Sequence, residues 1–139
     1  MDGPPFPGGE AAPIALVGVG ASDQFALAEA IDRRRIKWRG AFKDFEALAD
    51  AGPGTVSVVL LDGDAVAAEL IELLDQNLPI LSRNAVILQI STSPVRLVVS
   101  AMQRGVTDVL IKPFTAVRLD AALKDALTEC ERRTRVASA

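Results

Sequence analysis

The sequence predicts an α/β protein with one parallel sheet, and three observations support this fold class. From Pro13 onward, short β-branched runs alternate five times with longer stretches whose apolar residues have helical spacing. Three of these runs are almost continuously apolar, as expected of strands covered on both faces. A chain of 139 residues is long enough to bury the core of one such domain. We therefore expect a single domain built from five strand–helix units.

The predicted strands are the five short apolar runs. They cover residues 14–19, 37–41, 56–61, 85–90 and 107–111. The run 37–41 is more polar than the others, which suits an edge strand. Connections between parallel strands are right-handed crossovers, and five units without a sixth strand favour the order 2-1-3-4-5. This order describes a flavodoxin-like, three-layer α/β/α sandwich.

The helices between the strands are predicted from capping residues and from one apolar face each. Ser22, Thr92 or Ser93, and Thr115 can cap the first, fourth and fifth helices, and Gly105 stands where the fourth ends. The apolar faces are, helix by helix, Phe25, Ala28 and Ile31; Phe42, Phe45 and Ala49; Ala67, Leu70 and Leu74; Val95, Val98, Val99 and Met102; and Leu119, Leu123, Ala126, Leu127 and Cys130.

The domain organisation follows from composition. Residues 1–12 are rich in proline and glycine and predict a flexible leader, residues 13–133 form the domain, and residues 134–139 form a tail. The leader has acidic residues where a signal peptide has basic ones, and no apolar run is long enough to span a membrane. We therefore expect a cytoplasmic protein that does not bind membranes.

Composition also excludes several kinds of chemistry. The chain has no histidine and one cysteine, so it cannot form an internal disulfide, a His-dependent catalytic triad or a His/Cys zinc site. Its net charge is −3 and it has no tyrosine, which argues against direct nucleic-acid binding. The remaining chemistry has to use carboxylates, hydroxyls, lysine, arginine or backbone groups.

Three polar residues follow neighbouring strands of the predicted sheet. Asp62, Ser91 and Lys112 come at the ends of the third, fourth and fifth strands. In open parallel sheets the functional crevice lies at the carboxyl ends of the strands, and neighbouring strands are only about 4.8 Å apart. A carboxylate, a hydroxyl and an ammonium group suit phosphoryl transfer to Asp62, although the same residues also suit helix capping and charge pairing.

These motifs resemble those of bacterial response-regulator receiver domains. The similar segments are Leu60-Leu61-Asp62, Ile90-Ser91-Thr92 and Gly105-Val106-Thr107-Asp108-Val109-Leu110-Ile111-Lys112-Pro113-Phe114. The spacing of 29 residues from position 62 to 91, and of 21 from 91 to 112, also fits that family. The resemblance extends from about residue 13 to 133.

The resemblance implies a signalling domain of a bacterial two-component phosphorelay. Asp62 would accept a phosphoryl group from a histidine kinase or a phosphotransfer protein, and Mg²⁺, Ser91, Thr92 and Lys112 would bind it. The domain would not be an enzyme beyond self-phosphorylation and slow self-dephosphorylation. Its output would be contact with a downstream protein or output domain.

The sequence departs from the family in two places. Receiver domains end the first strand with two acidic residues that hold Mg²⁺, whereas this chain has Val17-Gly18 there, or Val19-Gly20 in a register shifted by two. Asp62 and Asp64 are then the remaining candidate Mg²⁺ ligands. Val109 stands where many receivers have a switch tyrosine or phenylalanine. A phosphorylated receiver and a degenerate pseudo-receiver therefore both remain open.

Two further alternatives are considered. Asp62-Gly63-Asp64-Ala65-Val66 also fits the nucleophile motif of haloacid-dehalogenase-like phosphatases, with Asp62 and Asp64 as the catalytic carboxylates. The second alternative is a docking or dimerisation module that works without phosphorylation. Its working surface is predicted on the fourth helix, the fifth strand and the fifth helix, at Leu97, Met102, Val109 and Leu119, where a homodimer can form.

Overall fold

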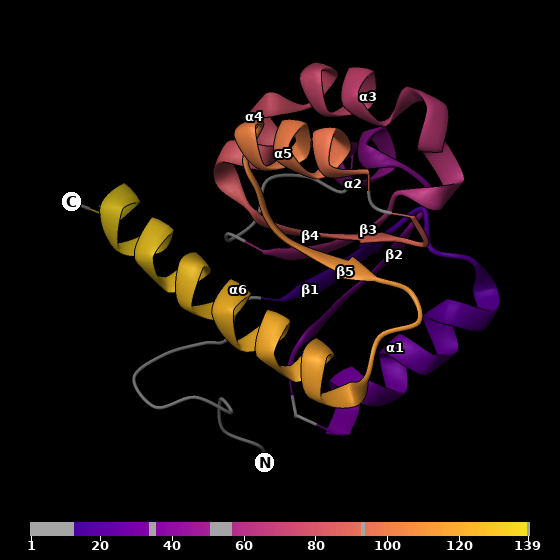
Figure 1. The fold of residues 1–139 in the computed structure, drawn as a ribbon. Helices are drawn as coiled ribbons and strands as arrows, with labels where there is room; N and C mark the ends of the chain where they lie inside the picture. The colour runs from indigo at the N-terminus through magenta and orange to yellow at the C-terminus, as the bar shows by residue number, and fades with distance from the viewer. Residues whose placement is uncertain (1–12, 34–35, 51–56, 93, 139) are drawn as a thin grey trace, which may run out of the picture.

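The chain folds around one parallel sheet in the predicted strand order. A computed structural model describes residues 13–33, 36–50, 57–92 and 94–138, and in it the strands lie in the order β2-β1-β3-β4-β5 (Figure 1). The strands are Ile14–Val17 (β1), Trp38–Phe42 (β2), Val58–Asp62 (β3), Ala85–Ile90 (β4) and Val106–Ile111 (β5). The predicted leader, residues 1–12, lies outside the described residues.

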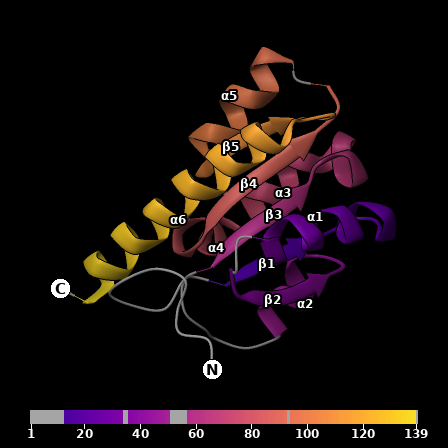
Figure 2. The same cartoon turned by 90° about the horizontal axis from the view of Figure 1, so that it is seen from below.

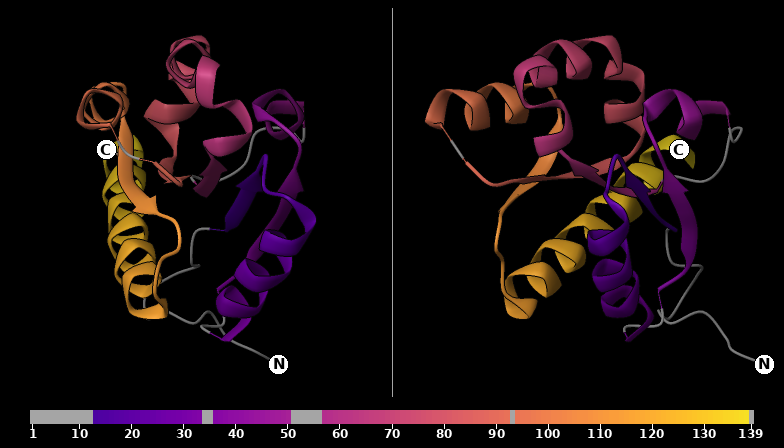
Figure 3. Two further views of the ribbon diagram at one scale, coloured as in Figure 1. Left: turned by 45° about the vertical axis from the view of Figure 1, so that its right-hand side comes forward. Right: turned by 90° about the vertical axis from the view of Figure 1, so that its right-hand side faces the viewer.

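Helices cover both faces of the sheet and complete the predicted three layers. They are Ala21–Arg33 (α1), Phe45–Asp50 (α2), the 3₁₀ helix Asp64–Glu69 (η1), Leu70–Gln76 (α3), Leu78–Arg83 (α4), Val95–Gln103 (α5) and Ala116–Ser138 (α6). Figure 2, seen from below, shows α1 and α6 over one face. Helices α2, α3, α4 and α5 cover the other, and both views of Figure 3 show the sheet between the two layers.

The central strand β3 is buried on both faces because each layer packs against it. Val58 and Leu60 pack in the cluster that includes α1 and α6, whereas Val59 and Leu61 pack in the cluster that includes α2 to α5. All four side chains are at most 2% exposed. This burial explains why the strand is a continuous apolar run, and it fixes the position of Asp62 at its end.

The segment between β3 and β4 differs from the single helix predicted for it. The chain forms η1, then α3, then the separate helix α4. Pro79 lies in the first turn of α4, where its missing N–H removes no helical hydrogen bond, and Asn77 separates the two helices. Leu70 and Leu74 are buried as predicted.

Helix α5 exposes most of the apolar side that the sequence predicts for it. Val95 is 77% exposed, and Val99 and Met102 are nearly half exposed, so this apolar side lies largely at the surface, where the sequence also predicts Met102. The core contacts of α5 are the buried Ala101 and the partly buried Leu97 and Val98. Gly105 ends this helix as predicted, with a φ of +109° that an L side chain rarely adopts.

Helix α6 matches its predicted face. Thr115 accepts a hydrogen bond from the Arg118 N–H at its first turn (3.1 Å), and Leu123, Ala126 and Cys130 are buried. The helix runs to Ser138, past the boundary predicted at residue 134. Within the described ranges, no helix combines the length and the apolar character needed to cross a membrane.

Candidate functional site

The sheet register brings the three predicted site residues to one edge. Asp62 is paired with Gln89 across β3 and β4, and Ile90 is paired with Ile111 across β4 and β5. The Lys112 N–H continues this ladder by donating to the Ile90 carbonyl (2.8 Å). Asp62, Ser91 and Lys112 are therefore next to one another where the strands end, as the sequence predicts.

Asp62 and Lys112 form the innermost contact of the site. Lys112 Nζ lies 2.9 Å from Asp62 Oδ2, and the two side chains are 21% and 9% exposed. Because water reaches neither group freely, each needs the other as a partner. The ammonium group thus balances the charge of the Asp62 carboxylate directly.

Asp64 is the most heavily bonded carboxylate of the site. Its Oδ1 accepts a hydrogen bond from the Ser91 N–H (2.9 Å), and its Oδ2 accepts one from the Ser91 hydroxyl (2.6 Å). Lys112 Nζ lies 3.2 Å from the same Oδ2. The Ser91 hydroxyl, which the sequence assigns to a phosphoryl group on Asp62, therefore donates to Asp64.

A tight turn places Asp64 in this position. The Asp64 N–H donates to Asp62 Oδ1 (2.9 Å), and the Gly63 N–H donates to the Gln89 carbonyl (2.8 Å). A Cβ atom at Gly63 would lie 2.6 Å from Ile90 Cγ2 and 2.8 Å from Leu88 Cδ1, closer than carbon atoms approach. Glycine at position 63 therefore allows the chain to turn against β4 and direct Asp64 toward Ser91.

The charges of the cluster stabilise one another. The Ser91 hydroxyl, the Ser91 N–H and the Lys112 ammonium lower the pKa of Asp64 below its ordinary value, although burial opposes them. Burial acts to lower the pKa of Lys112, but its hydrogen bonds to Asp62 and Asp64 outweigh this and raise it. Asp64 is consequently ionised and Lys112 protonated near neutral pH.

The segment after β1 brings no carboxylate beside Asp62. Gly18, Val19 and Gly20 follow the strand, and a Cβ atom at Gly18 would lie 3.8 Å from the Asp62 carbonyl oxygen. Asp23, in the first turn of α1, is the nearest acid on this side, with its Oδ2 4.0 Å from Lys112 Nζ. Asp23 is therefore a member of the site that the strand-end pattern does not reveal.

The residues of the site do not fit a Mg²⁺ ion. Among the described residues, no three His, Cys, Asp or Glu side chains are arranged to hold a metal ion. The Lys112 ammonium occupies the space between the two candidate ligands, Asp62 and Asp64. Mg²⁺ prefers oxygen ligands in an octahedral arrangement, and here the shared partner of the two carboxylates is already a cation.

Arg118 of α6 binds two residues of β5 on the surface predicted to carry the output. Its guanidinium group contacts the Asp108 carboxylate (2.8 Å) and donates to the Val109 carbonyl (3.0 Å). Val109 and Leu97 are partly buried and Met102 is exposed. Leu119 is only 4% exposed and packs in the core, so its assignment to the surface was wrong.

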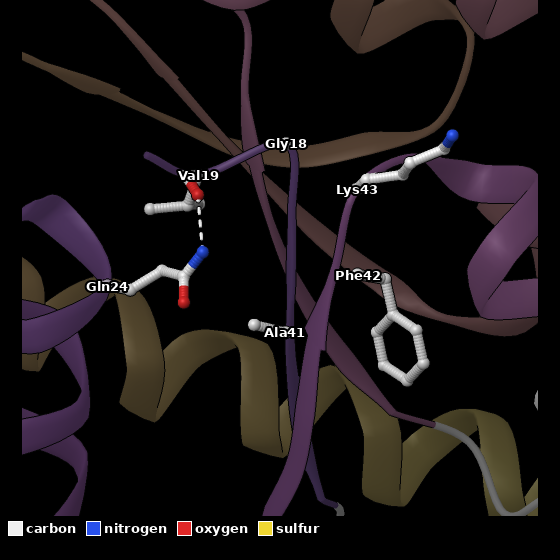
Figure 4. A pocket seen from close by; sticks show the side chains of 6 residues that line it. All are labelled: Gly18, Val19, Gln24, Ala41, Phe42 and Lys43. Carbon is white, nitrogen blue, oxygen red and sulfur yellow. Dashed lines mark hydrogen bonds between the residues drawn. The ribbon is translucent and has the colours of Figure 1, made fainter. Parts of the chain in front are cut away.

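A separate pocket lies on the far side of β1. It has a volume of about 390 Å³ and is lined by Gly18, Val19, Gln24, Ala41, Phe42 and Lys43. Figure 4 shows Gln24 bonded to the Val19 carbonyl (2.7 Å) and Lys43 directed away from the other side chains. Because no carboxylate or hydroxyl lines this pocket, it does not share the chemistry of the Asp62 site.

Gln89 is a further residue that the sequence analysis missed. It is 2% exposed and lies beside Asp62 in the sheet, and its Nε2 atom has no hydrogen-bond partner in the described part of the chain. The available sequence signal for Gln89 was its position as a polar residue within the apolar run 85–90. Thr92, predicted to act with Ser91, is exposed next to it.

Comparison with known proteins identifies the fold. No protein-family model matches the chain, and no curated protein matches it. Solved structures do match. NtrX from Brucella abortus in complex with ADP is 25% identical with a TM-score of 0.71, and the match covers 92% of this chain but 29% of that one.

Two further structures point the same way. Full-length FixJ from B. japonicum is 27% identical with a TM-score of 0.70, over 86% of this chain and 59% of that one. A signal receiver domain from Clostridium thermocellum is 16% identical with a TM-score of 0.65, over 84% of this chain and 97% of that one. The chain thus spans only part of the length of NtrX and FixJ but nearly all of an isolated domain of this type.

Proposed function

We propose that this chain, a response-regulator receiver domain of a two-component system, signals through protein contacts without a metal-dependent cycle of phosphorylation at Asp62. The structural matches confirm the receiver prediction and give no support to the phosphatase alternative. Receiver domains generally act as non-enzymatic signalling domains that work with histidine kinases and output domains. We propose that this chain differs from them in having no metal-dependent phosphorylation.

One observation carries the proposal. The segment after β1 passes beside Asp62 but consists of Gly18, Val19 and Gly20, so it offers no carboxylate to a metal ion. The next acid along the chain, Asp23, lies 4.0 Å from the Lys112 ammonium group. A metal ion at such a site would balance the charge that builds up during phosphoryl transfer. Without it, Lys112 is the only positive side chain that contacts Asp62 among the described residues.

The proposed output surface consists of five exposed apolar side chains on α5, β5 and α6, the elements next to the Asp62 site. Val95, Val99 and Met102 lie on α5, Ile111 ends β5 and Val117 begins α6, and each is at least 41% exposed. Apolar side chains gathered on adjoining elements are typical of a protein-binding surface. A second copy of the chain is the first partner to test, and a cytoplasmic location remains a prediction.

The experiment is incubation with acetyl phosphate, with and without Mg²⁺, followed by intact-mass measurement. We expect no phosphoryl adduct under either condition. A single Mg²⁺-dependent adduct that disappears in Asp62→Asn would overturn the proposal and identify an active receiver. Any adduct that persists in Asp62→Asn reports modification elsewhere and leaves the expected result at Asp62 intact.

The contact surface is tested separately by the solution mass. We expect a concentration-dependent dimer in sedimentation, and we expect Val99→Asp to convert it to a monomer without lowering the melting temperature, since Val99 is nearly half exposed. Lys124→Asp, on an exposed position of α6, is the matched control. A wild-type chain that stays monomeric at high concentration excludes a second copy as the partner.

A further inference from the structure

We propose that the Asp64 carboxylate is an internal ligand of the anion-binding donors of Ser91 and Lys112, so that the chain carries its own substitute for an attached phosphoryl group. This inference deepens the proposed function and rests on it for the role of these donors. It concerns one residue that the sequence analysis considered only as a metal ligand or a catalytic acid.

The donors around Asp64 are of the kinds that bind a phosphoryl group. An amide N–H, a hydroxyl and an ammonium group all meet the two oxygens of Asp64, at 2.9, 2.6 and 3.2 Å. A hydroxyl and an ammonium group are the groups that stabilise phosphoryl oxygens. Here both are already used by a side-chain anion.

Asp64 also lies where a phosphoryl group on Asp62 would need these donors. The Asp64 N–H donates to Asp62 Oδ1, and Lys112 Nζ contacts an oxygen of each carboxylate. The Asp64 carboxylate thus lies directly beside the oxygens on which a phosphoryl group would be attached. A phosphoryl group on Asp62 would need the same Ser91 and Lys112 donors, so the two anions would compete for them.

The negative charge already present at the site also favours a carboxylate over a phosphoryl group. Asp62 and Asp64 already share Lys112, and Asp23 lies within 4.0 Å of the same ammonium group. Like charges at such distances disfavour one another. A singly charged carboxylate is therefore accommodated more easily than a phosphoryl group, which would carry more negative charge to the same place.

The consequence is a fixed arrangement of the two loops that follow β4 and β5. Ser91 precedes α5, and Lys112 precedes α6, on which Val95 and Val117 are exposed. Asp64 contacts both Ser91 and Lys112, so it joins these loops without any added group. The output surface is therefore held in one state that does not depend on a kinase.

The test is chemical rescue by formate, the smallest carboxylate, observed in ¹H–¹⁵N correlation spectra. Asp64→Ala removes the carboxylate and leaves space for formate. We expect the Ser91 amide resonance, whose N–H donates to Asp64, to shift in Asp64→Ala and to return toward its wild-type position as formate replaces chloride at constant ionic strength. Wild type should not respond.

Three controls make the result specific. Asp64→Asn keeps the side-chain volume, so formate should not restore its Ser91 resonance. The double variant Asp64→Ala/Ser91→Ala lacks the hydroxyl donor. The formate concentration needed to shift its residue 91 amide resonance should be at least tenfold higher than in Asp64→Ala. Glu131→Ala removes an exposed acid from the distant half of α6 and should leave the Ser91 resonance unchanged.

The inference is overturned if formate has no effect on Asp64→Ala, or if it shifts wild type equally. The samples contain neither a phosphodonor nor Mg²⁺, so this result is independent of the acetyl phosphate experiment. A phosphoryl adduct on wild-type Asp62 would overturn the proposed function alone. Absence of formate rescue would overturn the internal-ligand inference alone.

Discussion

The two ends of the sheet carry polar networks of different kinds. At the carboxyl ends of the strands, Asp62, Asp64, Ser91 and Lys112 bond mainly to one another through ionised side chains. At the opposite end, most of the bonds run from side chains to the backbone, although Arg133 also pairs with the Glu129 carboxylate (3.1 Å). Since backbone groups neither titrate nor exchange for a solute, we expect the bonds of Asn84 to respond less to pH and to added anions than those of Asp64 do.

The opposite network is centred on Asn84. Its Oδ1 accepts a hydrogen bond from the N–H of the buried Ser57 (2.9 Å), and its Nδ2 donates to the Ile80 carbonyl (2.9 Å). Arg133 donates to the carbonyls of Leu81 and Asn84. This network fixes the end of α6 against the start of β4, and we assign it a structural role only.

The largest effect is expected from Lys112→Met. This change leaves Asp62, whose side chain is 9% exposed, without its cation. We expect the free energy of unfolding to fall by about 3 kcal/mol in urea denaturation, and we expect the double variant Lys112→Met/Asp62→Asn to recover most of the loss. Lys124→Met is the control, with an expected change within about 0.5 kcal/mol. A loss from Lys112→Met no larger than that of the control would contradict the ion pair.

The next effect is expected from Asn84→Ala at the opposite edge. It leaves the buried Ser57 N–H without an acceptor, which costs about 2 kcal/mol of unfolding free energy. The Ser91 amide resonance should stay in place, because the network at the other edge does not involve Asn84. Movement of that resonance would show that the two networks are coupled.

The smallest effect is expected from Asp64→Asn, and it depends on pH. The pKa of Asp64 is lowered in the folded chain from its ordinary 3.8. Its ionised form therefore stabilises the fold fully above about pH 4, and this contribution is lost as the pH falls below 3.8 through the folded pKa. The stability difference between wild type and Asp64→Asn should accordingly narrow in acid. A difference that is constant from pH 7 to pH 3 would exclude this contribution.

Much of the fold could be predicted because the strands are apolar on both faces. The range 85–90 was predicted for β4 without error, and β3 and β5 differ only at their ends. The division into η1, α3 and α4 was not predicted, although Pro79 is a sequence signal for the start of α4. The exposure of Val95 and Val99 on α5 could not be predicted, because periodicity shows that a helix has an apolar side but not what covers it.

The site was predicted in outline and not in detail. The position of Asp62, Ser91 and Lys112 at neighbouring strand ends places them together whatever the loops do. The direction of the Asp64 side chain depends on the turn at Gly63 and on its close approach to Ile90, which no sequence pattern reveals. The spacing of Asp62 and Asp64 was noticed, but it predicted a metal site or a phosphatase motif. The roles assigned to these residues stay predictions.

The central claim is that the Asp64 carboxylate is held by Ser91, and an NMR titration tests it most directly. The carboxyl carbon of Asp64 and the amide of Ser91 would be followed together from neutral pH into acid. We predict one shared midpoint below 3.8, and a higher Asp64 midpoint in Ser91→Ala. An Asp64 carboxyl that titrates at its ordinary pKa, with a Ser91 amide that does not follow it, would contradict the account.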